Sequence, residues 1–145
     1  MKAAEVLLVD DNPADTDLTS EILSRNGCAS RIHSVFNGVE AIEYLRRKGK
    51  YASAPLPDFV ILDLSLPGKD GRAVLAEIKG DQLLRKIPIA VFSTSEAQQD
   101  IVSSYELGAN CYVRKPGNLQ DFISAVASIG EFWLGVARMP REEES

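Results

Sequence analysis

Acidic residues directly follow two short apolar runs of this 145-residue chain. Asp10 and Asp11 come after residues 6–9, and Asp63 comes after residues 59–62. Runs that are short, β-branched and without polar alternation are typical of strands buried on both faces of a parallel sheet. The carboxyl ends of such strands share the edge of the sheet where ligands bind, so the three carboxylates should lie close together. Because like charges this close repel one another, the pattern predicts a site for a divalent cation.

Magnesium is the predicted cofactor, because Mg²⁺ takes oxygen ligands in near-octahedral geometry and usually keeps some water. The predicted direct ligands are the carboxylates of Asp11 and Asp63 and the backbone carbonyl of Ser65, which lies in the turn after the second strand-end acid. Asp10 is expected to act on the ion through water.

Ser93 and Lys115 follow two further strand-like segments, residues 87–92 and 111–113, and so belong to the same edge of the sheet. A carboxylate can act as a nucleophile and form an aspartyl-phosphate. The transferred phosphoryl group carries charge on its equatorial oxygens, which groups placed in advance can stabilise. The ammonium suits one of these oxygens, the hydroxyl a second and the metal the third. The pattern therefore predicts that Asp63 is a phosphoryl acceptor.

Each of these residues on its own has an ordinary structural use. A lone aspartate after a strand usually caps a helix, a lone serine lies in a turn and a lone lysine is solvated. Their joint placement at strand ends carries the hypothesis. The Lys115-Pro116 bond is also predicted to be cis, a form accessible mainly before proline, which would aim the lysine into the site.

The rest of the chain alternates strand-like and helix-like segments. Asn12 and Pro13 predict the start of the first helix, and Asn26-Gly27 predicts its end. Regular alternation implies an α/β fold, a doubly wound five-stranded parallel sheet with helices on both faces and right-handed crossovers. The predicted strands are residues 6–9, 29–35, 59–62, 87–92 and 111–113. The predicted helices begin at residues 13 and 38, pass through residues 74–78, and cover residues 97–107 and 119–136.

Size and charge indicate a single domain over residues 1–136, followed by a charged tail at residues 137–145. A net charge of −5 argues against nucleic acid or an anionic membrane as the main partner. No apolar stretch has the length of a membrane span, and the first residues lack a signal-peptide core. Cys28 and Cys111 are expected to be reduced thiols, which favours a cytoplasmic location. His33 is expected to be structural.

Over residues 5–130 the chain resembles the receiver domains of two-component response regulators. The matching motifs are Val9-Asp10-Asp11-Asn12, Leu62-Asp63, Leu66-Pro67-Gly68-Lys69-Asp70-Gly71, Ser93, Tyr112 and Lys115-Pro116. A closer resemblance is to the single-domain regulators paired with cyanobacterial and bacterial phytochrome histidine kinases. It is carried by Asp-Asn-Pro-Ala-Asp at residues 11–15, by Ser93-Thr94-Ser95 and by Phe132-Trp133-Leu134.

The resemblance implies a flavodoxin-like sheet with strand order 2-1-3-4-5. It implies that a sensor histidine kinase, here of the phytochrome kind, passes a phosphoryl group to Asp63 in a Mg²⁺-dependent reaction, and that Ser93 and Tyr112 form a conformational switch. Such a protein is a phosphoacceptor that catalyses its own phosphorylation and slow autodephosphorylation, and is not otherwise an enzyme. Ser65 and Thr94 depart from the commonest family residues, which leaves the phosphoryl lifetime and the preferred donor open.

Other functions fit the residues less well. A receiver fold used only as a non-phosphorylated docking or dimerisation adaptor usually lacks an acid or the lysine, and this chain retains them. A phosphatase with an aspartate nucleophile needs a second acid two residues later, where the chain has Ser65 or Asn12. A DNA-binding regulator needs an output domain, and nothing after the last predicted helix is expected to form one. Gly68 and Gly71 do not match the P-loop pattern.

The last predicted helix carries an apolar stripe that continues past the point where the sheet should end, through Ile129, Phe132, Trp133 and Val136. Exposed patches rich in large rings usually mark an interface, and twofold dimers are the commonest assembly. A homodimer through this C-terminal region is therefore expected. The alternative is that the segment folds back and buries the Trp133 ring within its own subunit.

Overall fold

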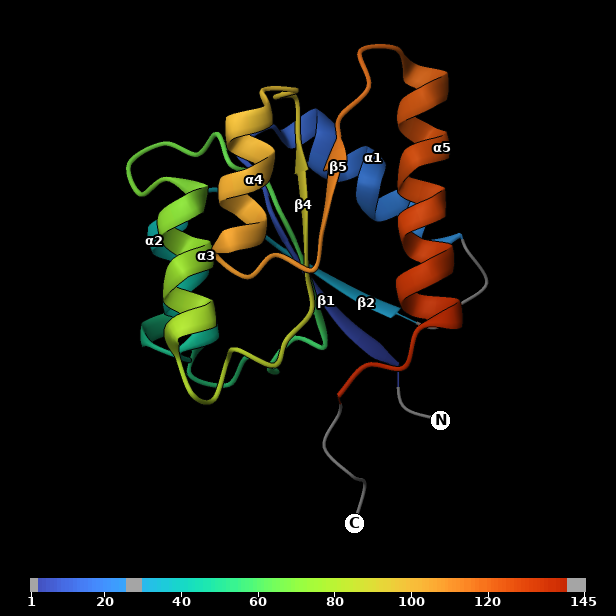
Figure 1. The fold of residues 1–145 in the computed structure, drawn as a ribbon. Coiled ribbons are helices and arrows are strands. Elements are labelled where there is room, and N and C mark those ends of the chain that lie inside the picture. Colours follow the sequence, from blue (N-terminus) through green and yellow to red (C-terminus); the bar gives the residue numbers. More distant parts are fainter. Residues whose placement is uncertain (1–2, 26–29, 141–145) are drawn as a thin grey trace.

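Five parallel strands form one sheet in the computed structural model, which describes residues 3–25 and 30–140 (Figure 1). The order is β2-β1-β3-β4-β5, with β1 at Ala4–Val9, β2 at Ser30–Val35, β3 at Phe59–Leu62, β4 at Ile89–Ser93 and β5 at Cys111–Arg114. The central strands β1, β3 and β4 are buried along their whole length. The predicted doubly wound sheet with strand order 2-1-3-4-5 is confirmed.

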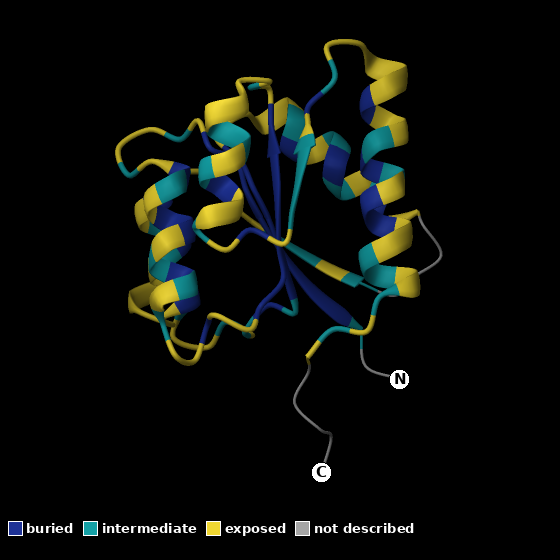
Figure 2. Cartoon of the chain, viewed as in Figure 1, coloured by how far each residue is buried: buried dark blue, intermediate teal, exposed yellow. Residues whose placement is uncertain are grey.

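Helices cover both faces of this sheet (Figure 1). One face carries α1 (Pro13–Ser24) and α5 (Leu119–Gly130), and the other carries α2 (Gly38–Leu45), α3 (Gly71–Gly80) and α4 (Gln98–Glu106). Buried side chains therefore form two apolar layers, one between each set of helices and the strands (Figure 2). Full burial of a large aliphatic or aromatic side chain contributes roughly 1.5–3 kcal/mol, so these layers supply the main stabilisation of the fold.

Strand register decides which residues meet at the carboxyl edge of the sheet. Val9 at the end of β1 pairs with Leu62 at the end of β3. The next residue, Asp63, donates its backbone N–H to the Val9 carbonyl at 2.9 Å. At the same edge, between β4 and β5, the Lys115 backbone N–H donates to the Ser93 carbonyl at 2.7 Å. Backbone hydrogen bonds thus hold the acid and the lysine immediately beyond the ends of their strands.

The first helix begins where the sequence predicts. Pro13 occupies its first turn, and the Asn12 side chain accepts a hydrogen bond from the Asp15 backbone N–H. The predictions for residues 26–29, which include the end of α1 and the thiol of Cys28, lie outside the described residues.

The last helix changes type within its predicted range. α5 stops at Gly130, and a wider π-type turn at Glu131–Val136 follows it, in which the Ala137 N–H donates to the Phe132 carbonyl at 2.7 Å. The prediction of a helix over residues 119–136 is therefore confirmed in its extent, but residues 131–136 are π-helical rather than α-helical. Turns of this width change the direction of the side chains that follow, relative to an α-helix.

The four residues predicted to be uncovered differ in their exposure to solvent. Trp133 stacks on Phe59, with ring centroids 5.2 Å apart and planes 20° apart, and Ile129 is buried. Phe132 and Val136 remain 52% and 68% exposed. The prediction of a continuous uncovered stripe is wrong for Ile129 and Trp133, because the turn places the indole over the first residue of β3.

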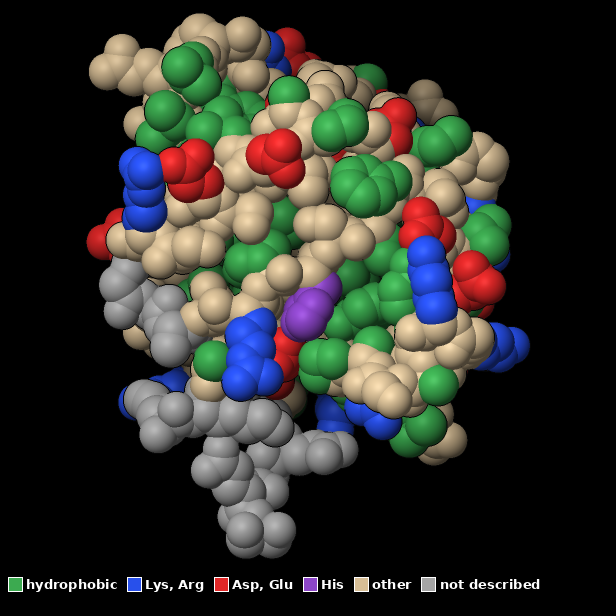
Figure 3. All heavy atoms as spheres, turned by 180° about the vertical axis from the view of Figure 1, so that it is seen from behind, with side chains coloured by type: hydrophobic (Ala, Val, Ile, Leu, Met, Phe, Trp, Pro, Cys, Tyr) green, Lys and Arg blue, Asp and Glu red, His purple; other side chains and the backbone are tan. Residues whose placement is uncertain are grey.

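The histidine and the described cysteine lie away from the carboxyl edge. His33 pairs with Leu7 in the middle of the β1–β2 ladder, and its Nε2 lies 2.7 Å from Glu5 Oε2 on the back of the molecule (Figure 3). Cys111 is a free thiol whose pKa is raised by burial. None of the helices in the described part of the chain combines the length and the apolarity that crossing a membrane requires.

Replacing Trp133 by alanine should lower the free energy of unfolding by about 3 kcal/mol, because the stacked indole would leave a cavity against Phe59. Val136→Ala, in the same turn but largely exposed, should change it by less than about 0.5 kcal/mol. Urea unfolding followed by far-ultraviolet circular dichroism measures both. Equal unfolding midpoints for the two variants would show that the indole does not contribute to the core.

Candidate functional site

An acidic cluster lies at the carboxyl edge of the sheet, where the sequence predicts it. Asp10 and Asp11 follow β1 and Asp63 follows β3, and one carboxylate oxygen from each lies within 4.8 Å of the others. Asp10 and Asp63 are largely buried, whereas Asp11 is exposed. Such a group of hard oxygen donors, open to solvent on one side, fits a divalent cation.

Short local hydrogen bonds orient the two buried acids. The Asn12 backbone N–H donates to Asp10 Oδ1 at 2.9 Å, and the Ser65 backbone N–H donates to Asp63 Oδ1 at 3.1 Å. In both cases the second carboxylate oxygen stays available to other partners. The role of the Ser65 carbonyl as a metal ligand stays a prediction.

Lys115 extends into this cluster from the end of β5. Its Nζ donates to Asp10 Oδ2 at 2.7 Å, to Asp63 Oδ2 at 2.9 Å and to Asp15 Oδ2 at 3.0 Å. The residue is only 5% exposed, and these acceptors match the three hydrogens that an ammonium carries. The Lys115-Pro116 bond is trans, so the prediction of a cis bond is wrong. The parallel register of β5 with β4 suffices to aim the lysine into the site.

Burial and the shared ammonium together set the direction of the pKa shifts of Asp10 and Lys115. Burial raises the pKa of Asp10, and this effect outweighs its hydrogen bonds from Lys115 and Asn12. Burial alone would lower the pKa of Lys115, but hydrogen bonds to Asp10 and Asp63 more than offset it and raise the pKa. The lysine therefore stays charged at neutral pH, and one positive charge among these acids leaves room for a second cation.

Ser93 lies at the end of β4, beside the lysine, as predicted. It is 1% exposed, and its Oγ accepts a long hydrogen bond of 3.5 Å from the Ser95 backbone N–H. Asp10, Asp63, Lys115 and Ser93 are thus brought to one buried edge, with Asp11 at its surface.

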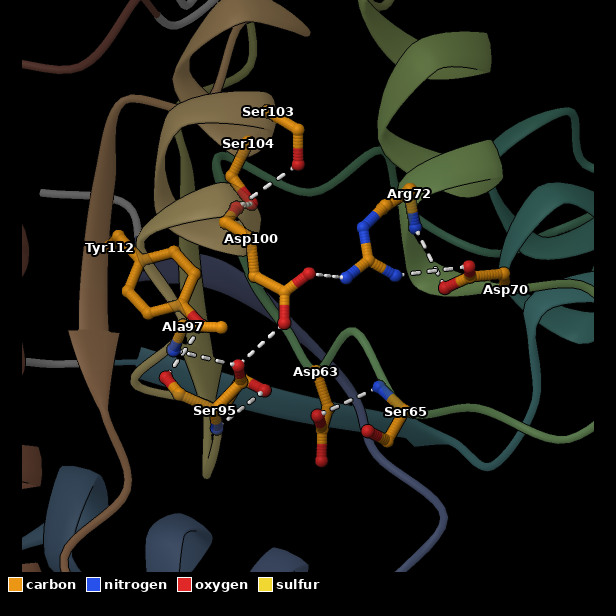
Figure 4. A network of polar contacts seen from close by, with 11 residues as sticks. Asp63, Ser65, Asp70, Arg72, Ser95, Ala97, Asp100, Ser103, Ser104 and Tyr112 are labelled. Atoms are coloured by element: carbon orange, nitrogen blue, oxygen red, sulfur yellow. Dashed lines mark hydrogen bonds and ion pairs between the residues drawn. The ribbon is translucent and has the colours of Figure 1, made fainter.

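A second set of polar contacts begins beside this edge and connects three elements (Figure 4). Arg72, at the start of α3, forms an ion pair with Asp100 of α4. Ser95 Oγ, in the loop after β4, donates to Asp100 Oδ2 at 2.5 Å. These hydrogen bonds, first from Ser95 and then from Arg72, hold the pKa of Asp100 below its usual value.

Tyr112, the predicted switch residue, completes this network from β5 (Figure 4). Its hydroxyl donates to the Ser95 carbonyl at 2.8 Å, and its ring is partly buried against the core. Ser95 therefore links two neighbours. Its side-chain hydroxyl contacts Asp100, and its backbone carbonyl contacts the Tyr112 hydroxyl. Its position, two residues after Ser93, places it between the acidic edge and the tyrosine.

Sequence reasoning did not identify Asp15, Arg72, Ser95 or Asp100 as parts of the site. Arg72 and Asp100 meet only because α3 and α4 lie side by side, which no local pattern reveals. Asp15 had a weak signal, since it ends the 11–15 motif.

Comparison with known proteins assigns this arrangement to a family. Residues 6–127 match the response regulator receiver domain. Response regulator Rcp1 of Synechocystis sp. is 41% identical over 135 residues, which cover 93% of this chain and 92% of Rcp1.

Two solved structures agree with this match. The crystal structure of the phosphorylated cyanobacterial phytochrome response regulator RcpA has a TM-score of 0.93 and 46% identity, covering 97% of this chain and 100% of RcpA. The Mn²⁺-bound form of Rcp1 has a TM-score of 0.93 and 40% identity, covering 95% of this chain and 99% of that one. Because the family match covers residues 6–127 and the likeness to Rcp1 covers nearly the whole of both chains, this chain belongs to the response regulator receiver domain family.

Proposed function

We propose that this protein is a stand-alone response regulator that accepts a phosphoryl group on Asp63 and changes conformation to signal to partners. The observation that carries the proposal is the Lys115 ammonium, 2.9 Å from Asp63 Oδ2 at the centre of the acidic edge. It catalyses its own phosphorylation and slow dephosphorylation and turns over no other substrate.

The transfer uses the groups already in place. A carboxylate oxygen of Asp63 forms a bond to phosphorus while the bond from phosphorus to the donor breaks, and a donor histidine leaves as imidazole. Lys115 stabilises negative charge on one phosphoryl oxygen, and the Ser93 hydroxyl donates to another. Asp10, Asp11, Asp63 and the Ser65 carbonyl would hold Mg²⁺, which supplies further charge neutralisation when bound.

The proposed donor is a sensor histidine kinase of the phytochrome kind, in the cytoplasm. The support is the likeness to RcpA and Rcp1, which extends over nearly the whole of both chains. The motifs at residues 11–15, 93–95 and 132–134 contribute to the same likeness.

Incubation with acetyl phosphate and Mg²⁺ should add one phosphate to the wild-type chain, and Asp63→Asn should add none, because the amide is not a nucleophile. Chelating Mg²⁺ with EDTA should slow the addition at least about tenfold, since removing one transition-state contact of this kind costs that much or more. Intact-protein mass spectrometry followed by peptide mapping gives both answers.

Asp17→Asn is the matched control, because Asp17 is exposed on α1 and this change also removes one negative charge. It should be phosphorylated at the wild-type rate. A wild-type chain that acquires no phosphate would favour the non-phosphorylated adaptor. A phosphate on another residue would contradict the assignment of Asp63.

We further propose that Ser93 and Tyr112 transmit the phosphorylated state. The hydroxyl of Ser93 moves toward the phosphoryl group, and the loop that holds Ser95 moves with it, which changes the hydrogen bond between the Ser95 carbonyl and the Tyr112 hydroxyl. A phosphoryl group can shift this equilibrium only by binding the two states unequally.

Ser93→Ala should still accept phosphate but should show at most about half of the wild-type shift in the Tyr112 ring signals, because the differential contact is lost. Nuclear magnetic resonance of ring-labelled tyrosine, with beryllofluoride as the phosphoryl mimic, measures the shift. The buried Tyr44 serves as an internal reference, since its ring packs against the rings of His33 and Tyr51. Equal Tyr112 shifts in the two proteins would rule out the coupling.

A homodimer through the C-terminal segment is the remaining part of the proposal. Phe132 and Val136 are exposed there, and Leu119 and Ile123 of α5 are 63% and 39% exposed. Aromatic anchors usually carry such contacts.

Phe132→Glu should convert the phosphorylated protein from dimer to monomer at tens of micromolar, because it places a charge in the contact. Light scattering measures the mass. Leu83→Glu is the matched control, since Leu83 is an exposed apolar residue far from this segment in the sequence, and it should leave the mass unchanged. A wild-type monomer under these conditions would end the dimer proposal.

A further inference from the structure

We propose that Asp15 is a positioning residue, which holds the Lys115 ammonium in place for phosphoryl transfer. This inference rests on the proposed function and adds a residue to it. Asp15 Oδ2 accepts from Lys115 Nζ at 3.0 Å, so the carboxylate shares this cation with Asp10 and Asp63. The contact joins residues that lie 100 positions apart in the chain.

The local structure of the β1–α1 turn brings Asp15 to this place. The Asn12 N–H donates to Asp10 Oδ1 at 2.9 Å, and the Asn12 side chain accepts from the Asp15 N–H at 3.1 Å. Pro13 starts the helix between them. Asp10 and Asp15 are thereby fixed relative to each other by one residue that bonds to both. Both carboxylates accept a hydrogen bond from Lys115 Nζ.

An acidic residue in the first turn of a helix also has a plain structural use, because it interacts favourably with the helix dipole. That use does not require a partner outside the helix. Here the carboxylate reaches a lysine that is 4% exposed in its side chain, although it could have remained in solvent as Asp17 does. The specific partner is what favours a role in the site.

The partners of Lys115 do not all have the same fate in the reaction. Asp10 and Asp63 belong to the acidic cluster that fits a divalent cation, whereas Asp15 does not. A cation bound there competes with the lysine for the first two carboxylates, and phosphorylation turns the Asp63 carboxylate into an acyl phosphate. Asp15 takes part in neither event, so it remains a partner of the lysine throughout.

This difference gives Asp15 a directional effect. An ammonium has three hydrogens in fixed tetrahedral directions. With one of them held by Asp15, the other two stay directed toward Asp10 and Asp63, where one of them meets an oxygen of the arriving phosphoryl group. Without Asp15, the ammonium can rotate and shift, and positional loss of this kind lowers the rate of the chemical step.

Steady phosphorylation by acetyl phosphate at saturating Mg²⁺ tests the role with three variants, followed by mass spectrometry over a range of donor concentrations. Asp15→Ala should lower the maximum rate by about fivefold, as the loss of one charged hydrogen bond in a partly exposed site allows. Asp15→Asn keeps an oxygen that can accept from the ammonium, and should recover at least half of the wild-type maximum rate. Asp17→Ala changes an exposed aspartate two residues further along α1, and should match the wild type.

The dependence on donor concentration separates position from charge. If Asp15 acted only as one more negative charge that repels the anionic donor, both Asp15 variants would show a lower KM with an unchanged maximum rate. That result would overturn the proposal, as would a maximum rate of Asp15→Ala within twofold of the wild type. An equal loss in the alanine and asparagine variants would assign the effect to charge and would also overturn it.

A second measurement needs no phosphorylation. The ¹⁵N signal of the Lys115 ammonium should be resolved and slowly exchanging in the wild type at low temperature, and broadened by exchange in Asp15→Ala but not in Asp17→Ala. An unchanged signal in Asp15→Ala would contradict the positioning role. If the wild type shows the rigid ammonium but accepts no phosphate, the proposed function fails while the assignment of Asp15 as the holder of Lys115 stands.

Discussion

A buried ammonium surrounded by carboxylates is the interaction on which the site depends. Lys115 lies inside the protein, where an unpaired charge would cost several kcal/mol, and it is tolerated because acids from two strands and one helix accept all of its hydrogens. The converse also holds, since the ammonium offsets the mutual repulsion of the Asp10 and Asp63 carboxylates. The first and last strands of the folding unit are therefore joined by electrostatics at the same place where the chemistry is proposed. Any charged group that enters the site must change the contacts between the ammonium and the carboxylates. The site is therefore sensitive to both a metal ion and a phosphoryl group.

The sheet supplies the geometry that this balance needs. Parallel strands end at one edge, and the register of β1 with β3 and of β4 with β5 sets the acids and the lysine opposite one another. Helices on both faces keep water from the strands, so the charges meet in surroundings of low polarity. The chemistry is concentrated at the edge because β3 carries only apolar side chains and β4 carries only apolar side chains before Ser93.

The sequence predicted most of this because strand ends can be recognised locally. Asp10, Asp63, Ser93 and Lys115 each follow a short apolar run, and a parallel sheet leaves few other places for them. It could not predict contacts between helices, such as the ion pair of Arg72 with Asp100, since these depend on how α3 and α4 lie against each other.

Two local predictions differ from the structure. An α-helical pattern continues through residues 131–136, but this segment is a π-helix in which Trp133 stacks on Phe59. The Lys115-Pro116 bond was predicted to be cis to aim the lysine, and strand pairing already does so in the trans form. At the proline the ordinary trans preference is kept, whereas at Trp133 a contact with the sheet accompanies the departure from α-helical geometry.

The stacking of Trp133 on Phe59 gives the molecule an intrinsic optical reporter. Trp133 is the one tryptophan of the chain, and it sits on the first residue of the strand that ends at Asp63. A strand of this length separates the indole from the acidic edge by roughly 13 Å. Its fluorescence therefore reports whether the C-terminal segment packs on the sheet. This contact lies at the start of β3, at the opposite end of the strand from Asp63. Emission that responds to events at Asp63 would then measure how far a change at one end of β3 is felt at the other.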